Sequence, residues 1–285
     1  MAKQDDLAGL LRTQVNRSGL VFQAGVERRI RDTQQHHEWR VLSSEHAWWD
    51  EAGNSGYIDL VLARQSVRVV IECKKKDATT WVFLCPREDA EPPVYDVKML
   101  FGLAVRRRMA APNAPTNMRL EMDWEDRGVI TPSPQARFCV RDKDEIIEAT
   151  SRTLLLATEA VAAQELELRA HQNQPGLTYY IPVIVTNARL SICSFAARHV
   201  DPANGLLTGE EQFTDTILVR FRKSFLTKKP EPLIGSDLGD INTERDRTVL
   251  IASAAHIDQL LAQLMVRGGP PPWSKVQQIV GEEQG

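Results

Sequence analysis

Two carboxylates and a lysine stand near the ends of two apolar segments that follow one another in the chain. Asp59 belongs to the first segment, and Glu72 and Lys74 end the second. Because side chains alternate along a strand, Glu72 and Lys74 should project from one face while Cys73 points to the other. Pairing of the two segments as a hairpin would bring Asp59 beside Glu72. The pattern therefore predicts two carboxylates and an amine around one point.

Groups of this kind are suited to metal-dependent hydrolysis of phosphodiesters. The carboxylates of Asp59 and Glu72 can hold Mg²⁺ or Mn²⁺, hard cations that prefer oxygen ligands. A bound metal lowers the pKa of water and neutralises charge in the transition state. Lys74 can orient or deprotonate the attacking water, or stabilise the developing negative charge. The alternative is a solvent-facing pair of Glu72 and Lys74 on an edge strand, and the preceding Gly-x-x-Asp favours the catalytic interpretation.

Hydrophobic patterning predicts the elements that position these residues. Strands are expected over 39–42, 57–63, 67–74, 79–84, 179–186, 190–195, 216–221 and 247–253, and helices over 21–31, 144–170 and 256–265. The alternation of strands and helices in the second half favours a single α/β domain over 1–267, with a central mixed β-sheet flanked by helices. Residues 86–97 and 111–135 are interpreted as loops of a Pro-rich insertion spanning about 86–135, and 268–285 as a tail.

The composition excludes several classes of protein. With 42% hydrophobic and 26% charged residues, the chain of 285 residues is not disordered throughout. No apolar run reaches the roughly 18 residues needed to span a bilayer, and Met1 to Asp6 lack a signal-peptide core, so a cytoplasmic location is expected. The four cysteines are too dispersed for a zinc site or a disulfide framework and are interpreted as buried small hydrophobes. The absence of a P-loop, a dinucleotide fingerprint and a nucleophile elbow disfavours an ATPase, a dehydrogenase and an α/β-hydrolase.

A net charge of −3 means that nucleic acid would have to be held by local basic clusters. These clusters are Arg28, Arg29 and Arg31; Lys74 to Lys76; Arg106 to Arg108; and Lys228 with Lys229. The alternative interpretation of each cluster is a solvent-exposed surface with no ligand. Trp48 and Trp49 either stack on bases or pack the edge of the core. Thr186 and Asn187 either contact phosphate or form the turn after a strand.

The motif Gly56 to Asp59, followed by Ile71 to Lys74, resembles that of the PD-(D/E)XK nuclease superfamily. The resemblance covers about residues 20–85, with looser support from 179–186. It implies a restriction-endonuclease-like core, which consists of a helix, a three- or four-stranded meander, a second helix and a further strand. Ile58 stands where the family motif has proline, and the Gln-x-x-x-Tyr of some DNA-cleaving branches is absent, so the branch stays open.

The same resemblance implies roles for individual residues. Asp59 and Glu72 would be metal ligands, with the backbone carbonyl of Cys73 as an additional ligand, and Lys74 would be the catalytic lysine. Many members carry a further acid on the first helix. Glu27 occupies a suitable place for it, and Gln23 and Glu45 are the alternatives.

The implied function is a Mg²⁺- or Mn²⁺-dependent endonuclease, with DNA favoured over RNA as the substrate. Restriction, antiviral defence against phage, or DNA repair is the role that such a resemblance suggests. Members often dimerise, so a homodimer is expected. A partner protein for recognition or activation is also expected, because the chain has no helix-turn-helix or similar DNA-reading module. The alternative function is a non-catalytic binding or scaffold subunit that keeps the nuclease fold.

Overall fold

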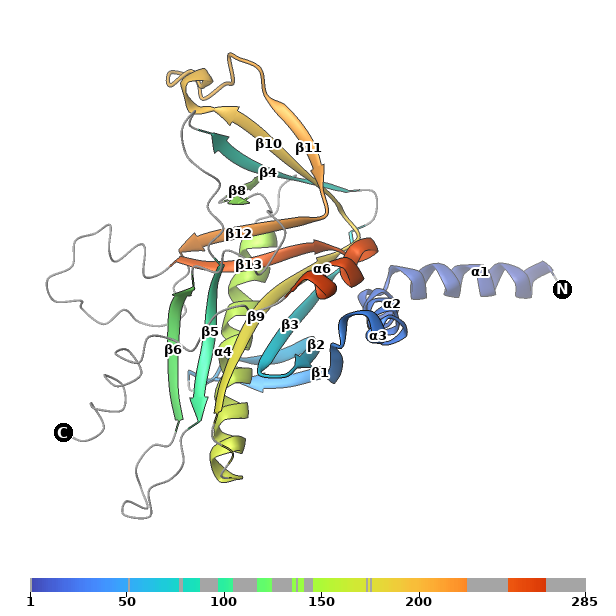
Figure 1. Cartoon of the computed structure of the whole chain (residues 1–285). Coiled ribbons are helices and arrows are strands. Elements are labelled where there is room, and N and C mark those ends of the chain that lie inside the picture. Colours follow the sequence, from blue (N-terminus) through green and yellow to red (C-terminus); the bar gives the residue numbers. More distant parts are fainter. Residues whose placement is uncertain are drawn as a thin grey trace, which may run out of the picture.

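A mixed β-sheet forms the centre of the computed structural model (Figure 1). The structure describes residues 2–50, 52–76, 79–87, 97–104, 117–124, 135–136, 138–140, 146–172, 174, 176–224 and 246–264. The strands are β1 (Arg40–Trp49), β2 (Ser55–Arg64), β3 (Val67–Lys74), β4 (Thr80–Arg87), β5 (Val97–Ala104), β6 (Asn117–Trp124), β7 (Gln135–Ala136), β8 (Phe138–Val140), β9 (Gly176–Thr186), β10 (Arg189–Ala196), β11 (Gln212–Thr216), β12 (Leu218–Ser224) and β13 (Asp246–Ser253). The helices are α1 (Ala2–Arg17), α2 (Gly19–Asp32), α3 (Gln34–His37), α4 (Ile146–His171) and α6 (Ile257–Gln263), with 3₁₀ turns η1 (Ala197–His199) and η2 (Ala254–His256).

An antiparallel meander of β1, β2 and β3 forms one side of the sheet. After α4, the chain returns as β9, which pairs in parallel with β3 from Val67↔Tyr179 to Lys74↔Thr186. β13 continues the sheet in parallel with β9, and β12 pairs antiparallel with β13. The antiparallel pair of β5 and β6 joins the first half of β9. The prediction of an α/β fold with a mixed central sheet flanked by helices is confirmed.

Apolar side chains of β3 enter two cores on opposite faces of the sheet. Val69 and Ile71 pack with α2 and α6, in what we call the α2-side core. Val70 packs with α4 in the α4-side core. The run Val67 to Ile71 therefore lacks the alternation of a half-exposed strand because β3 is buried on both faces.

Helix α2 was predicted from its stripe, and Val26 and Ile30 are indeed buried. Ser18 caps it by accepting a hydrogen bond from the Leu20 amide. The long helix predicted over 144–170 is α4. Helix α1 was not predicted, and none of the described helices is long and apolar enough to cross a membrane.

Two parts of the described chain differ from the prediction. β4 is the strand predicted over 79–84, but it joins β8, β10 and β11 in a second, smaller sheet, whereas a single central sheet was predicted. β6 lies within the segment predicted as a loop, residues 111–135, and pairs with β5 along its whole length. The proposed tail, residues 268–285, lies outside the described residues.

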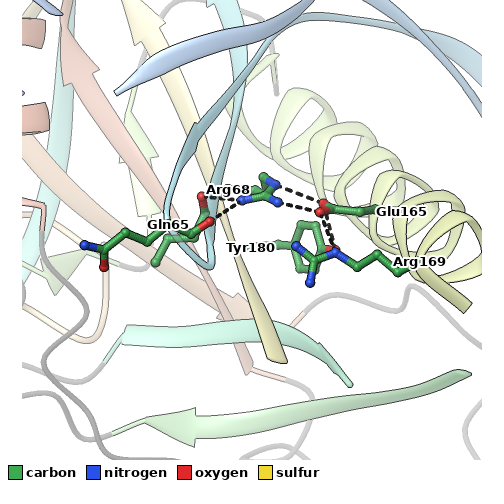
Figure 2. Close-up of polar contacts among 6 residues, drawn as sticks. Gln65, Arg68, Glu165, Arg169 and Tyr180 are labelled. Carbon is green, nitrogen blue, oxygen red and sulfur yellow. Dashed lines mark hydrogen bonds and ion pairs between the residues drawn. The ribbon is translucent and has the colours of Figure 1, made fainter. Parts of the chain in front are cut away.

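A buried polar network fixes the turn between β2 and β3 against α4 (Figure 2). Arg68 binds Glu165 through two hydrogen bonds, of 3.0 and 2.5 Å, and its third nitrogen donates to the carbonyl of Gln65. Glu165 also accepts hydrogen bonds from the side chains of Arg169 and Tyr180, each at 3.1 Å. Burial, followed by the charge of Glu165, raises the pKa of the Tyr180 hydroxyl. The network therefore holds β3 and β9 at a fixed position relative to α4.

Candidate active site

The candidate site lies where β2 and β3 separate. The register of the two strands runs to Leu60↔Ile71, and the next residues along are Asp59 and Glu72. At this point Oδ2 of Asp59 accepts a hydrogen bond from the backbone amide of Cys73, at 2.6 Å. The side chain of Asp59 thus holds the last part of β3, and its carboxylate is directed toward the strand that carries Glu72.

Lys74 and Glu72 form an ion pair on β3, with 2.6 Å between Nζ and Oε1. Their side chains are 32% and 19% exposed, and the strand lies between β2 and β9. β3 is therefore not an edge strand of the sheet, and the two side chains are only partly exposed. Cys73 points into the α2-side core, and burial raises the pKa of its thiol, so only its backbone belongs to the site.

The backbone of β1 and β2 is irregular beside Asp59. The register passes from Ser44↔Leu60 to His46↔Ile58, and Glu45, which lies between the paired residues on β1, has a φ of 50°. Ile58 packs in the α4-side core and Leu60 in the α2-side core, so the alternation of β2 is interrupted at Asp59. A non-glycine residue in the left-handed region costs free energy and is concentrated at functional sites.

The electrostatic environment raises the pKa of Asp59 to about 6. Burial of the carboxyl group is the largest cause, and the negative charge of Glu72 is the second. The Cys73 amide and Lys74 act in the opposite direction, while Glu45 adds to the repulsion. A cation placed between the two carboxylates would relieve that repulsion, which is the electrostatic state expected of a metal site.

The end of β9 supports the lysine from the other side. Thr186, which is fully buried, donates a hydrogen bond from its hydroxyl to the carbonyl of Lys74 at 2.7 Å. The side-chain carbonyl of Asn187 accepts from the amide of Lys76 at 2.6 Å. Both residues, which the sequence left open between phosphate contact and a turn, position the backbone that follows Glu72.

Helix α2 contacts the site through Gln23 and not through the acid that the sequence favoured. The buried amide of Gln23 donates to the backbone carbonyl of Asp59 at 3.2 Å. Glu27 instead forms an ion pair with Arg31, at 2.6 Å. Burial acts to raise the pKa of Glu27, but hydrogen bonds from Arg31 and Ser44 outweigh the effect of burial, so the pKa is lowered. Of the three candidates for the additional acidic position, Gln23 and Glu45 interact with Asp59, and the carboxylate of Glu27 is held by Arg31.

The two tryptophans have different environments. Trp48 is buried in the α4-side core, whereas Trp49 is 64% exposed. Tyr57, which was not predicted to be functional, is 72% exposed and lies diagonally across from Trp49 on the hairpin. Strand register identifies this pair, because Tyr57 pairs with Ala47 and Ser55 with Trp49.

The basic clusters are used in different ways. The arginines of α2 form ion pairs: Arg28 with Asp32, Arg29 with Asp258, and Arg31 with Glu27. The run Lys74 to Lys76 begins within the candidate site. Residues 106–108 and 228–229 lie outside the described residues. Among the clusters that the structure describes, the lysine run is the one that contacts a carboxylate of the site, through Lys74.

The described residues contain no group of three or more His, Cys, Asp and Glu side chains that could enclose a metal ion. Asp59 and Glu72 supply two carboxylates on adjacent strands, and water molecules would have to complete the coordination sphere. Mg²⁺ suits such a site, because it retains several waters and commonly takes only one or two protein carboxylates.

Asp59→Asn is expected to stabilise the metal-free protein at about pH 8 by about 1–2 kcal/mol, a figure reduced to allow for partial solvent screening. The folded protein holds the Asp59 proton up to about pH 6, whereas the unfolded chain loses it near the ordinary value of 3.8. Asp59 therefore contributes stability at low pH that is lost as the pH rises through 6. Urea unfolding at several pH values measures the difference, with the surface variant Asp215→Asn as the control. A difference that does not change with pH would contradict the assignment.

No protein-family model matches this chain, and comparisons with curated proteins and with solved structures found no match. The geometry and electrostatics of Asp59, Glu72 and Lys74 are therefore what indicates a function.

Proposed function

We propose that the protein is a Mg²⁺- or Mn²⁺-dependent endonuclease of the restriction-endonuclease-like kind. The observation that carries the proposal is the position of Asp59 and Glu72 on adjacent strands, together with the ion pair between Lys74 and Glu72. Repulsion between the two buried or half-buried acids contributes to the raised pKa of Asp59. A carboxyl group with a perturbed pKa, such as that of Asp59, beside a lysine is typical of catalytic sites, whereas a scaffold has no use for it.

The order of the elements supports the same proposal. Helix α2 and the short α3 are followed by the meander of β1, β2 and β3; strands β4 to β8 come next, and then α4 and β9, which lies parallel to β3. With β4 to β8 regarded as an insertion, this order is compatible with the helix, meander, helix and strand that the family resemblance implies. The candidate acids lie on the second and third strands of the meander.

Each residue would have a separate role. Asp59 and Glu72 would bind the cation, and the backbone carbonyl of Cys73 would be a further ligand. The metal would supply an activated water and neutralise charge on the phosphate. Lys74 would orient that water or stabilise the developing negative charge, while Gln23 and Thr186 hold the backbone of the two strands in place.

DNA is the favoured substrate, with RNA as the second candidate. The run Lys74 to Lys76 would attract the phosphate backbone, and the exposed rings of Trp49 and Tyr57 would offer stacking surfaces for bases. A cytoplasmic role in restriction, antiviral defence or repair, and a partner protein that supplies recognition or activation, belong to the same proposal.

Cleavage assays test the proposal directly. Supercoiled plasmid, linear DNA and RNA are incubated with Mg²⁺, with Mn²⁺ and with chelator, using the wild type, Asp59→Ala and Glu72→Ala. We expect metal-dependent cleavage that both variants lose and that Asp215→Asn, an exposed carboxylate paired with Arg189, retains. Calorimetry in the absence of substrate distinguishes the rival function. A wild type that neither cuts nor binds metal would be the nuclease-fold scaffold subunit.

A further inference from the structure

Exposed aromatic side chains gather beside the candidate site. In the part of the chain that the structure describes, these side chains are Trp49, Tyr57 and Phe213, which are 64%, 72% and 60% exposed. Trp49 and Tyr57 are diagonal neighbours on the hairpin of β1 and β2. Diagonal neighbours lie about 7–8 Å apart, within reach of aromatic side chains. Tyr57 also precedes Asp59 by two residues on β2, so the aromatic pair borders the candidate site.

The hairpin holds these two rings in fixed positions. Trp48, the neighbour of Trp49, is buried in the α4-side core. Its indole lies against Gly56, where an added Cβ would be only 3.1 Å from Nε1 of Trp48. At the turn, the carboxylate of Asp50 accepts hydrogen bonds from the amide and the side chain of Asn54, at 2.8 and 2.7 Å. A platform that is already rigid loses little conformational entropy when it binds a ligand.

The faces of both rings are available to a flat ligand. Among the described residues, the aromatic ring pair is Phe83 with Phe221, so Trp49 and Tyr57 are not stacked on each other. Every nucleobase has a π-face that can stack on such rings, whatever its sequence. Inside a duplex those faces are covered by the neighbouring base pairs, about 3.4 Å away along each strand, and only the base edges are open in the grooves. The rings can therefore accept bases only where the nucleic acid is unpaired.

The order of the strands determines how a single strand would lie. The rings are on β1 and β2, the carboxylates of Asp59 and Glu72 are on β2 and β3, and the lysine run 74–76 follows at the end of β3. A strand bound across this end of the sheet would place bases on the rings, a phosphate at the carboxylates and further backbone at the lysines. We infer that the substrate is an unpaired, single-stranded segment of DNA, held by stacking of its bases on Trp49 and Tyr57. The inference rests on the proposed function.

Binding of short oligonucleotides to the full chain tests the inference separately from cleavage. Fluorescence anisotropy compares a labelled oligothymidine strand with a closed duplex dumbbell of similar charge, using Ca²⁺ in place of Mg²⁺ and a check that both remain intact. The wild type should bind the single strand at least about tenfold more tightly than the dumbbell. Trp49→Ala and Tyr57→Ala should each weaken binding of the single strand by a factor of about five or more and leave the dumbbell within about a factor of two.

Matched controls separate stacking from other causes. Trp49→Phe and Tyr57→Phe keep an aromatic ring, so most of the affinity for the single strand should remain. Phe213→Ala removes an exposed ring from β11 of the smaller sheet, and it should leave both affinities unchanged. An abasic strand keeps its phosphates but has no bases, so the wild type should bind it no more tightly than the alanine variants do.

The possible outcomes distinguish the inference from the proposed function. Equal binding of the single strand and the dumbbell by the wild type would overturn the inference, and so would alanine variants that bind the single strand as tightly as the wild type. The rings would then bind a partner protein or another segment of the chain. Failure of the nuclease proposal looks different: binding of the single strand would still depend on the rings, but neither Mg²⁺ nor Mn²⁺ would produce cleavage.

Discussion

Replacement of Lys74 by methionine is expected to lower the rate of metal-dependent cleavage by a factor of about 10²–10⁴. The amine lies 2.6 Å from the Glu72 carboxylate but contributes no metal ligand. Its loss should therefore reduce the rate constant at saturating metal much more than it reduces metal affinity. Single-turnover cleavage measures the rate, and calorimetry with Mn²⁺ measures the affinity.

Lys76→Met is the matched control for this substitution. Lys76 belongs to the same run, and its backbone amide is already held by Asn187. Removal of its charge should weaken nucleic-acid binding at low salt and leave the rate at saturation within about a factor of three. The same loss of rate in both variants would mean that Lys74 acts only through its charge, and the catalytic role would have to be abandoned.

Lys74 should also alter the pH dependence of the reaction. Its positive charge lowers the pKa of Asp59, against the larger effects of burial and Glu72. In Lys74→Met the acidic limb of the pH–rate profile should therefore move to higher pH. Metal affinity has to be compared well above pH 7, where Asp59 is ionised in both proteins.

Local rules predicted the meeting of Asp59, Glu72 and Lys74. Alternation along a strand fixed the relative directions of Glu72 and Lys74, and a short turn between two β-branched runs required a hairpin. Glu45 and Gln23 were recognised only as alternatives to Glu27. The left-handed backbone of Glu45 leaves no periodic signal, and Gln23 contacts the backbone of Asp59 and not a complementary side chain.

Long-range pairing explains the other differences. β6 was interpreted as a loop because Asn117 and the surrounding prolines are poor strand formers, yet pairing with β5 along the whole strand overrides propensity. β4 belongs to a second sheet because its parallel partner is β10, which lies more than a hundred residues later. Helix α1 was missed because its apolar stripe is exposed among the described residues, so its pattern could not be related to a core.

Removal of the carboxylate of Glu165 is expected to destabilise the protein by about 3–5 kcal/mol. Arg68, whose side chain is only 7% exposed, would lose both of its bonds to that carboxylate and keep its charge in a buried position. Arg169 and the Tyr180 hydroxyl would lose the same acceptor. The Glu165→Ala variant should therefore unfold at a much lower urea concentration than the wild type.

The double variant Arg68→Met with Glu165→Leu separates the net contribution of the pair from the cost of an unpaired charge. The charges of Arg68 and Glu165 are removed together, but Arg169 and the Tyr180 hydroxyl still lose their acceptor. The double variant should therefore be destabilised by about 1–3 kcal/mol, less than Glu165→Ala. The exposed pair of Arg189 and Asp215 is the control: its side chains are 68% and 57% exposed, and breaking it should cost less than about 1 kcal/mol. Equal effects of Glu165→Ala and of the surface variant would mean that water replaces the lost carboxylate. The turn between β2 and β3 would then be held by strand pairing alone, and the position of the candidate site would not depend on α4.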